Sequence, residues 1–242
     1  MKILAIIQAR MGSERLPGKV VELIDGKPML QHVVERTKRC GLIDEVAIAT
    51  TINPSDQPIA DLCNSQDWKL FRGSEHDVLD RYYQAASFYN AQLIVRITSD
   101  CPLIDPDWIT RVIDPIRSSD LLVDYCSNVF PTRTLPRGLD VEVVTMSTLR
   151  RLWVNCKSPR LKEHVTLAVR EKPEDYRIHS VNHSEDLSAF RWTVDTLDDL
   201  NLIRQVFEHF GQNDFDWRQV RELMKVRPEL SLINQHVQQK AA

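Results

Sequence analysis

Three cationic side chains follow the first apolar run of the sequence. Arg10, Arg15 and Lys19 lie within ten residues, in the stretch QARMGSERLPGK, directly after the run ILAII. Cations at close quarters repel one another, so such a group occurs either on a solvated surface or around a polyphosphate. Because ILAII is typical of a buried strand, the position of the group favours a triphosphate ligand.

Glycine spacing separates this loop from two common phosphate-binding motifs. The P-loop GxxxxGK[ST] has four residues between its glycines, whereas five lie between Gly12 and Gly18, and Val20 replaces the magnesium-binding hydroxyl. The dinucleotide motif GxGxxG fails as well, because the loop holds only those two glycines. A strand, a glycine-containing loop and a helix in succession still bring backbone N–H groups together. The loop therefore predicts an anion site of another kind.

Two aspartates are candidate ligands for a divalent metal beside that anion. Asp100 follows the aliphatic run LIVRIT, and Asp195 ends the run RWTVD. A polyphosphate site usually includes a divalent cation held by carboxylates, and open α/β sheets bind ligands where their strands end. Each residue also has a structural alternative, because Asp195 can be a helix N-cap with Asp198 three residues on, and Asp100 a turn former before Pro102. Together, the two carboxylates favour a Mg²⁺ site.

A parallel sheet is the element that would position these side chains. The runs ILAII, EVAIAT, LIVRIT and VEVV are continuously apolar, as strands buried on both faces require. Helical spacing of apolar residues marks PMLQHVVERTKRCG, SDQPIADLCNSQ, HDVLDRYYQAASFYN and DWITRVIDPIRSS between and after them. We therefore expect one α/β domain over residues 1–242, with a mainly parallel sheet between helices.

The pattern changes to shorter pieces after about residue 120. SNVFPTRTLPRG is rich in proline and polar residues, and it is followed by a short helix from Ser147, a helix over 162–171 and the run RIHSVN. We expect an insertion at about 125–165 that forms an antiparallel hairpin or flap over the edge of the sheet. RWTV is then expected to be a strand before an amphipathic helix, and FDWRQVRELMKVRPEL to be a terminal helix.

Composition narrows the class of protein. The formal net charge of -3 gives no reason to expect a nucleic-acid partner. Five scattered cysteines without a CxxC pair argue against a zinc ribbon and a disulfide framework. The opening apolar run is too short for a secretory core or a membrane span. We expect a cytoplasmic protein without a membrane partner.

Several segments together resemble a known family over nearly the whole chain. QARMGSERLPGK, GKPML, SDCPLID, RGLDVEVV, KEHVT and VDTLDDL look like the cytidylyltransferases that activate acidic sugars as CMP derivatives. The closest likeness is the branch named after spore-coat polysaccharide biosynthesis, with CMP-ulosonate and CMP-acylneuraminate synthetases as cousins. Gln8 supports that branch, because the cousins usually have proline there. The resemblance implies a Rossmann-like three-layer α/β/α sandwich, similar to glycosyltransferase-A folds, and a reaction of CTP with a sugar that releases pyrophosphate.

The resemblance also assigns roles to residues. Lys19 and Arg15 are expected on the β- and γ-phosphates, Arg10 near the α/β bridge, and Mg²⁺ between Asp100, Asp195 and the phosphates. Other residues expected near the nucleotide are Gln8, Ala9, Met11, Gly12 and Ser13.

The acceptor sugar is expected to bind to the second half of the chain. Its candidate contacts are Arg137, Asp140, Glu142, Glu163 and His164. Arg137 suits a substrate carboxylate, and the others suit sugar hydroxyls. Structural alternatives stay open for two of them, because His164 can be a helix histidine satisfied by a neighbour and Glu142 can pair with a core arginine. Arg96, inside a strand, is expected to anchor a buried acid.

Other functions and the oligomeric state remain open at this level. A sugar-1-phosphate nucleotidyltransferase using UTP or GTP is one alternative, and a non-catalytic nucleotide-sugar-binding module is another. An NAD-linked oxidoreductase lacks its glycine motif. The family's insertion implies a homodimer, and its apolar residues either form that interface or simply cover the sheet. These apolar residues are Val129, Phe130, Leu135, Leu152 and Trp153.

Overall fold

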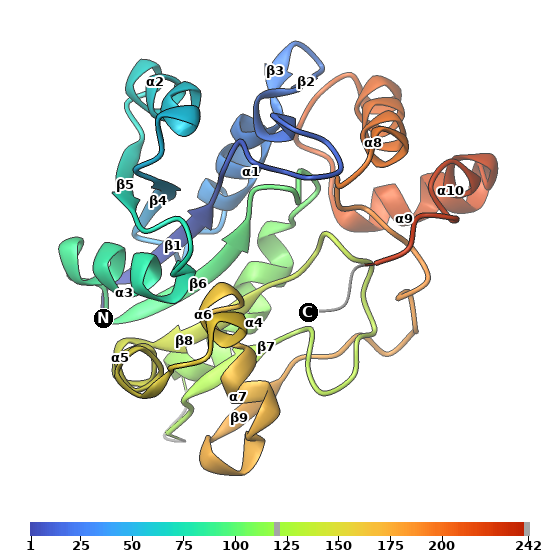
Figure 1. Cartoon of the computed structure of the whole chain (residues 1–242). Helices are drawn as coiled ribbons and strands as arrows, with labels where there is room; N and C mark the ends of the chain where they lie inside the picture. The colour runs from blue at the N-terminus through green and yellow to red at the C-terminus, as the bar shows by residue number, and fades with distance from the viewer. Residues whose placement is uncertain (119–121, 240–242) are drawn as a thin grey trace.

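A seven-stranded sheet is the centre of the computed structural model, which describes residues 1–118 and 122–239 (Figure 1). The strands lie in the order β5-β4-β1-β6-β8-β7-β9. Neighbouring strands from β5 to β6 are parallel, β8 runs antiparallel to both β6 and β7, and β9 is parallel to β7. Their bounds are β1 Ile3–Gln8, β4 Glu45–Thr51, β5 Lys69–Gly73, β6 Leu93–Thr98, β7 Tyr125–Ser127, β8 Glu142–Thr145 and β9 Ile178–Ser180.

Helices cover both faces of this sheet. Alternate residues of β1 show the division, because Ile3, Ala5 and Ile7 pack with α1, α2, α4, α8 and α9, whereas Leu4 and Ile6 pack with α3 and α5. The predicted three-layer α/β/α sandwich is therefore confirmed. The helices are α1 Met29–Lys38, α2 Gln57–Ser65, α3 Val78–Phe88, α4 Pro106–Ser118, α5 Met146–Asn155, α6 Pro159–Glu163, α7 Leu167–Glu171, α8 Leu197–Phe210, α9 Trp217–Val226 and α10 Glu229–Leu232.

Small elements complete the fold and join the layers. A two-stranded antiparallel sheet, β2 Leu23–Ile24 with β3 Lys27–Pro28, follows the cationic loop. Three short 3-10 turns lie at Lys19–Val21, Pro54–Asp56 and Pro173–Asp175. Helix α10 packs on both α8 and α9 at one side of the molecule (Figure 1). No helix within the described ranges is long and apolar enough to cross a membrane.

The structure differs from the sequence-based prediction in the second half of the chain. In segment 125–165, the antiparallel pair of strands β7 and β8 belongs to the main sheet, between β6 and β9. The run RWTV forms only one bridge, between Arg191 and Arg137, instead of a strand. The helix predicted over 162–171 is two short helices, because Val165 between them adopts a positive φ of 48°. Strand β5 was not predicted, since its residues are only half-buried at an edge and lack a long aliphatic run.

The apolar residues of the insertion mostly contact the same chain. Leu135 and Leu152 are buried in the two cores. Trp153 stacks on Tyr83 with ring centroids 4.2 Å apart, and its indole N–H donates to Asp80. These contacts favour the alternative in which the residues cover the sheet, and the homodimer stays a prediction.

An ion pair between Asp124, just before β7, and Arg177, just before β9, predicts that the stability of the fold depends on pH. Asp124 accepts hydrogen bonds from the backbone N–H and the guanidinium of Arg177, which lower the pKa of Asp124 to about 2. An unfolded aspartate titrates near a pKa of about 3.9. Because the folded pKa is the lower one, the stabilisation is complete above about pH 4 and is lost as the pH falls towards 2.

We therefore expect Asp124→Asn to destabilise the protein at pH 6 and to lose much of that effect near pH 3. Urea unfolding of both proteins at each pH measures the difference. A difference in unfolding free energy that stays constant between pH 6 and pH 3 would contradict the prediction.

Candidate active site

The ends of strands β1 and β6 bring the predicted site residues together. The two strands are parallel neighbours with Gln8 opposite Thr98, so the loops that follow them lie side by side. The segment before α8 joins them, because the N–H of Val194 and the hydroxyl of Thr193 both donate to the carbonyl of Asp100, at 2.8 and 3.1 Å. These backbone contacts place Asp195 next to Asp100, as the sequence predicted.

Lys19 lies between the two aspartates and is almost fully buried, with 8% of its surface exposed. Its Nζ donates to Asp195 Oδ1 at 2.8 Å, to Asp100 Oδ2 at 3.0 Å and to the carbonyl of Val194 at 2.7 Å. The sequence analysis placed this ammonium on the β- and γ-phosphates, whereas here it holds two carboxylates. A glycine is needed just before it, because Gly18 has a φ of 74° where the loop turns into its 3-10 helix.

Electrostatics keeps all three groups ionised. Burial alone would lower the pKa of Lys19, but the charges of Asp100 and Asp195 outweigh it and raise that pKa. Burial alone would raise the pKa of each aspartate, but the charge of Lys19 together with the hydrogen bonds to each carboxylate outweighs burial and lowers both pKa values. The centre is therefore two carboxylates sharing one ammonium, a compensated buried cluster.

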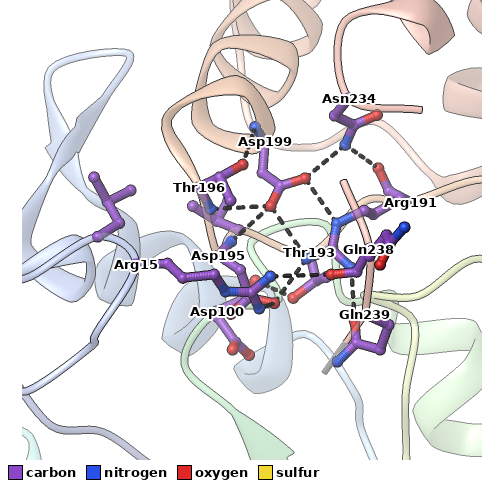
Figure 2. A network of polar contacts seen from close by, with 12 residues as sticks. Arg15, Asp100, Arg191, Thr193, Asp195, Thr196, Asp199, Asn234, Gln238 and Gln239 are labelled. Carbon is purple, nitrogen blue, oxygen red and sulfur yellow. Dashed lines mark hydrogen bonds and ion pairs between the residues drawn. The ribbon is translucent and has the colours of Figure 1, made fainter. Parts of the chain in front are cut away.

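Asp195 carries further cations on its second oxygen (Figure 2). Oδ2 of Asp195 lies 2.7 Å from Nη2 of Arg15 and 2.7 Å from Nη2 of Arg191. Arg15 also donates to the carbonyl of Gln238 at 3.1 Å, so the C-terminal segment reaches the same cluster. Arg10 is the least engaged cation of the loop, because it is half-exposed and its one ion pair within the described part of the chain, with Glu163, spans 4.0 Å.

Two adjoining cavities open onto this cluster. The smaller, of about 310 Å³, has most of the predicted nucleotide-binding residues in its wall. Met11 and Gly12 are not in that wall. Met11 instead shapes the loop, since its N–H donates to Asp56 at 2.6 Å and its carbonyl accepts from Gly18 at 2.9 Å. The predicted nucleotide- and metal-binding residues that line the smaller cavity are Gln8, Ala9, Arg10, Ser13, Arg15, Lys19, Asp100 and Asp195.

The larger cavity, of about 720 Å³, is lined by all five residues predicted to bind the acceptor. Asp140 is held by a bidentate contact with Arg133. Glu142 accepts from Arg96, Tyr125 and Thr166, so the structural alternative for Glu142 and the anchoring role of Arg96 are both observed. Those contacts occupy Glu142 with protein partners.

His164 lies between α6 and α7 instead of inside a helix. Its ring has no hydrogen-bond partner among residues 1–118 and 122–239, and it lines both cavities. Burial lowers the pKa of His164, which favours the neutral imidazole at neutral pH. A neutral ring can donate or accept one hydrogen bond from a bound sugar.

Sequence reasoning missed several charged residues around the cavities. The run RWTV predicts Arg191 to be a strand residue, and Arg81 lies within the helical run HDVLDRYY. Arg81 is 2% exposed, lines the smaller cavity and has a buried Nε without a partner among the described residues. Nε of Arg170, in the wall of the larger cavity, is in the same condition. One feature of the sequence could have identified such a residue, namely an arginine within an otherwise apolar helical stripe. Burying an arginine without a partner is costly, so its presence there indicates a ligand or an ion-pair partner.

Comparison with known proteins agrees with this geometry. A family model described as "Cytidylyltransferase" matches residues 4–226. The spore coat polysaccharide biosynthesis protein SpsF of Bacillus subtilis is 32% identical over 87% of this chain and 88% of its own length. A 3-deoxy-manno-octulosonate cytidylyltransferase of Pelobacter propionicus is 40% identical over 48% of this chain and 45% of its own length. A solved structure of a cytidylyltransferase from Leptospira borgpetersenii superposes with a TM-score of 0.92 over both whole chains, at 31% identity. The chain belongs to the cytidylyltransferase family and is similar to its spore-coat branch.

Proposed function

We propose that this protein transfers CMP from CTP to an acidic sugar, of the ulosonate or nonulosonate kind, and releases pyrophosphate. Such a product would serve surface polysaccharide or glycan biosynthesis. The observation that carries the proposal is the cluster in which Lys19 and Arg15 meet Asp100 and Asp195 where the two cavities adjoin. The names of the matched relatives support CTP as the nucleotide and an acidic sugar as the acceptor.

The proposed reaction forms a bond between a sugar oxygen and the α-phosphorus and breaks the bond from that phosphorus to the pyrophosphate oxygen. Catalysis then consists mostly of positioning and of charge neutralisation. Arg10 and Arg15 line the smaller cavity and are expected to bind the phosphates as they give up their contacts with Glu163 and Asp195. The sugar hydroxyl proton passes to Asp195 or to water.

Asp100 and Asp195 are the residues that would hold Mg²⁺. The donor set fits a cation, because Asp100 Oδ2 and Asp195 Oδ1 both lie within 3.0 Å of the same ammonium nitrogen. No group of three or more acidic, histidine or cysteine side chains converges among the described residues, so water and phosphate oxygens would complete the coordination. Bound there, Mg²⁺ would neutralise phosphate oxygens. Lys19 would have to yield part of its contact with the carboxylates.

The charges in the larger cavity support an acidic acceptor. Three of its arginines, Arg15, Arg96 and Arg133, have carboxylate partners at 2.7 Å or less. The guanidiniums of Arg137 and Arg170, which line the same cavity, have no hydrogen-bonded carboxylate among residues 1–118 and 122–239. An unpartnered arginine presents a planar fork that matches a carboxylate. We expect the carboxylate of the sugar to bind on this side.

One assay tests the proposal and separates it from the alternatives. The protein is mixed with Mg²⁺, each of the four NTPs and a panel of free ulosonic acids and sugar phosphates, and pyrophosphate is measured. We expect release with CTP and a free ulosonic acid, and its loss in Asp100→Asn. Release with UTP or GTP and a sugar phosphate would instead identify a sugar-1-phosphate nucleotidyltransferase. No release with any pair, together with CTP binding that Asp100→Asn leaves unchanged, would leave a binding module.

A further inference from the structure

Arg191 is the cation of the cluster that the fold itself holds in place. Its side chain is 7% exposed, and its guanidinium makes a fork with Asp199, through Nε to Oδ1 at 2.8 Å and Nη2 to Oδ2 at 3.1 Å. The same Nη2 donates to Oδ2 of Asp195 at 2.7 Å (Figure 2). A bidentate arginine–carboxylate contact fixes orientation as well as distance. Arg191 therefore approaches Asp195 from a fixed direction.

Asp199, the partner of that fork, is fully buried and anchored from several sides. Its Oδ2 accepts the backbone N–H groups of Asp195 at 2.9 Å and Thr196 at 3.0 Å. Thr196 and Asp199 form the capping box of α8, so these contacts belong to the start of the helix. One carboxylate thus holds the backbone of Asp195 directly and its side chain through Arg191.

The C-terminal segment closes this network. Asn234 is 2% exposed, and its Nδ2 donates to Oδ1 of Asp199 at 2.8 Å and to the carbonyl of Arg191 at 3.0 Å. Gln239 adds a contact at 2.6 Å from its Oε1 to Nη1 of Arg191. Every nitrogen of the guanidinium is then used by a protein group that lies outside the cationic loop.

Arg15 and Lys19 differ from Arg191 because both belong to the cationic loop after β1. Arg15 belongs to the loop after β1, its side chain is 25% exposed, and its second contact is with a backbone carbonyl near the C-terminus. Both residues are also the ones expected to bind phosphate. When CTP attracts them, Asp195 loses contacts from the loop and keeps Arg191.

We propose that Arg191 is a positioning residue that holds Oδ2 of Asp195, so that Oδ1 stays directed at the cation position now filled by Nζ of Lys19. Asp199 and Asn234 are its anchors. This inference rests on the proposed function, because it takes Asp195 as a ligand in nucleotide transfer. Partners that orient a metal-binding carboxylate typically matter by about 10–100-fold in metal affinity or activity.

The test is Arg191→Lys, which keeps the charge but cannot form the fork. We expect kcat for pyrophosphate release to fall about 10–100-fold, with a smaller change in KM for CTP because the cationic loop is intact. Mn²⁺ binding in the presence of CTP can be followed by electron paramagnetic resonance. We expect the Kd of the variant for Mn²⁺ to be at least about tenfold higher than that of the wild type. Asn234→Ala should shift both quantities in the same direction by less, and it provides a second variant if Arg191→Lys does not fold.

Arg36→Lys is the matched control for a purely structural arginine. Arg36 is fully buried and donates to the carbonyls of Ile104 at 2.7 Å and Phe215 at 3.0 Å, which do not line either cavity. It should lower the melting temperature and leave kcat and Mn²⁺ binding unchanged. Folded Arg191→Lys and Asn234→Ala proteins with wild-type kcat and Mn²⁺ affinity would overturn the inference. A wild type that releases no pyrophosphate refutes the proposed function instead, and Mn²⁺ binding still decides whether Arg191 positions Asp195.

Discussion

Replacing Lys19 with methionine is expected to lower kcat for pyrophosphate release by roughly 10²–10³-fold, the size seen when one preorganised charge-stabilising donor is removed. Lys19 is the only ion-pair partner of Asp100 among residues 1–118 and 122–239, whereas Asp195 keeps Arg15 and Arg191. The variant therefore leaves the half-buried carboxylate of Asp100 without a cation, and it also removes a positive charge from the wall of the smaller cavity.

Steady-state kinetics can separate two roles of this ammonium, on the carboxylates and on the phosphates. If Lys19 stays on the carboxylates when CTP binds, kcat falls and KM for CTP changes little. If Lys19 moves to the phosphates, as the sequence suggested, KM rises as well. Lys27→Met is the control, because Lys27 pairs with Glu35 on the surface, away from both cavities. A folded Lys19→Met protein with unchanged kcat and KM would contradict the assignment of Lys19 to the site.

Of the substitutions proposed for this protein, Arg96→Met is expected to lower the free energy of unfolding most, by about 3–5 kcal/mol. This is the usual result of removing one partner of a buried ion pair. Arg96 and Glu142 lie opposite each other on β6 and β8 and pair across the sheet. Glu142 is 3% exposed, and burial alone would raise its pKa, but the charges of Arg96 and Arg170 and the hydrogen bonds from Tyr125 and Thr166 together keep that pKa low. Without Arg96 the carboxylate must either stay charged in a dry environment or take up a proton.

Urea unfolding of Arg96→Met at pH 7 measures this effect. Glu142→Gln is the partner variant, and it should cost less, because the amide can keep hydrogen bonds with Tyr125 and Thr166. The double variant should be more stable than the sum of the two single losses predicts, since it removes both charges together. Additive losses would show that the two residues do not interact, and an Arg96→Met loss below about 1 kcal/mol would place the pair among weak surface contacts.

Local sequence was enough to predict the layers of the fold and to select charged residues that line one cavity. Continuous aliphatic runs identified β1, β4, β6 and β8, because strands buried on both faces must be apolar throughout. Five charged residues that lie in or directly after these runs and the run RWTVD line one cavity in the structure. They are Arg10, Arg15, Lys19, Asp100 and Asp195. Strand β5 was missed because a half-buried edge strand carries no such run.

Only the tertiary structure decided which charges are partners. Lys19 pairs with Asp100 and Asp195, which lie 81 and 176 positions after it in the sequence. No local pattern can specify an ion pair over such a separation. The capping box of α8 uses Thr196 and Asp199, one residue later than the sequence alternative, which leaves Asp195 free for the cluster. Sequence by itself determined that cations follow β1 and that a carboxylate follows β6, because the type of a side chain and its position after a strand are local properties. The folded chain decided that Lys19 faces carboxylates and that Arg191 joins them, because ion pairs depend on which strand ends and helix starts meet in space.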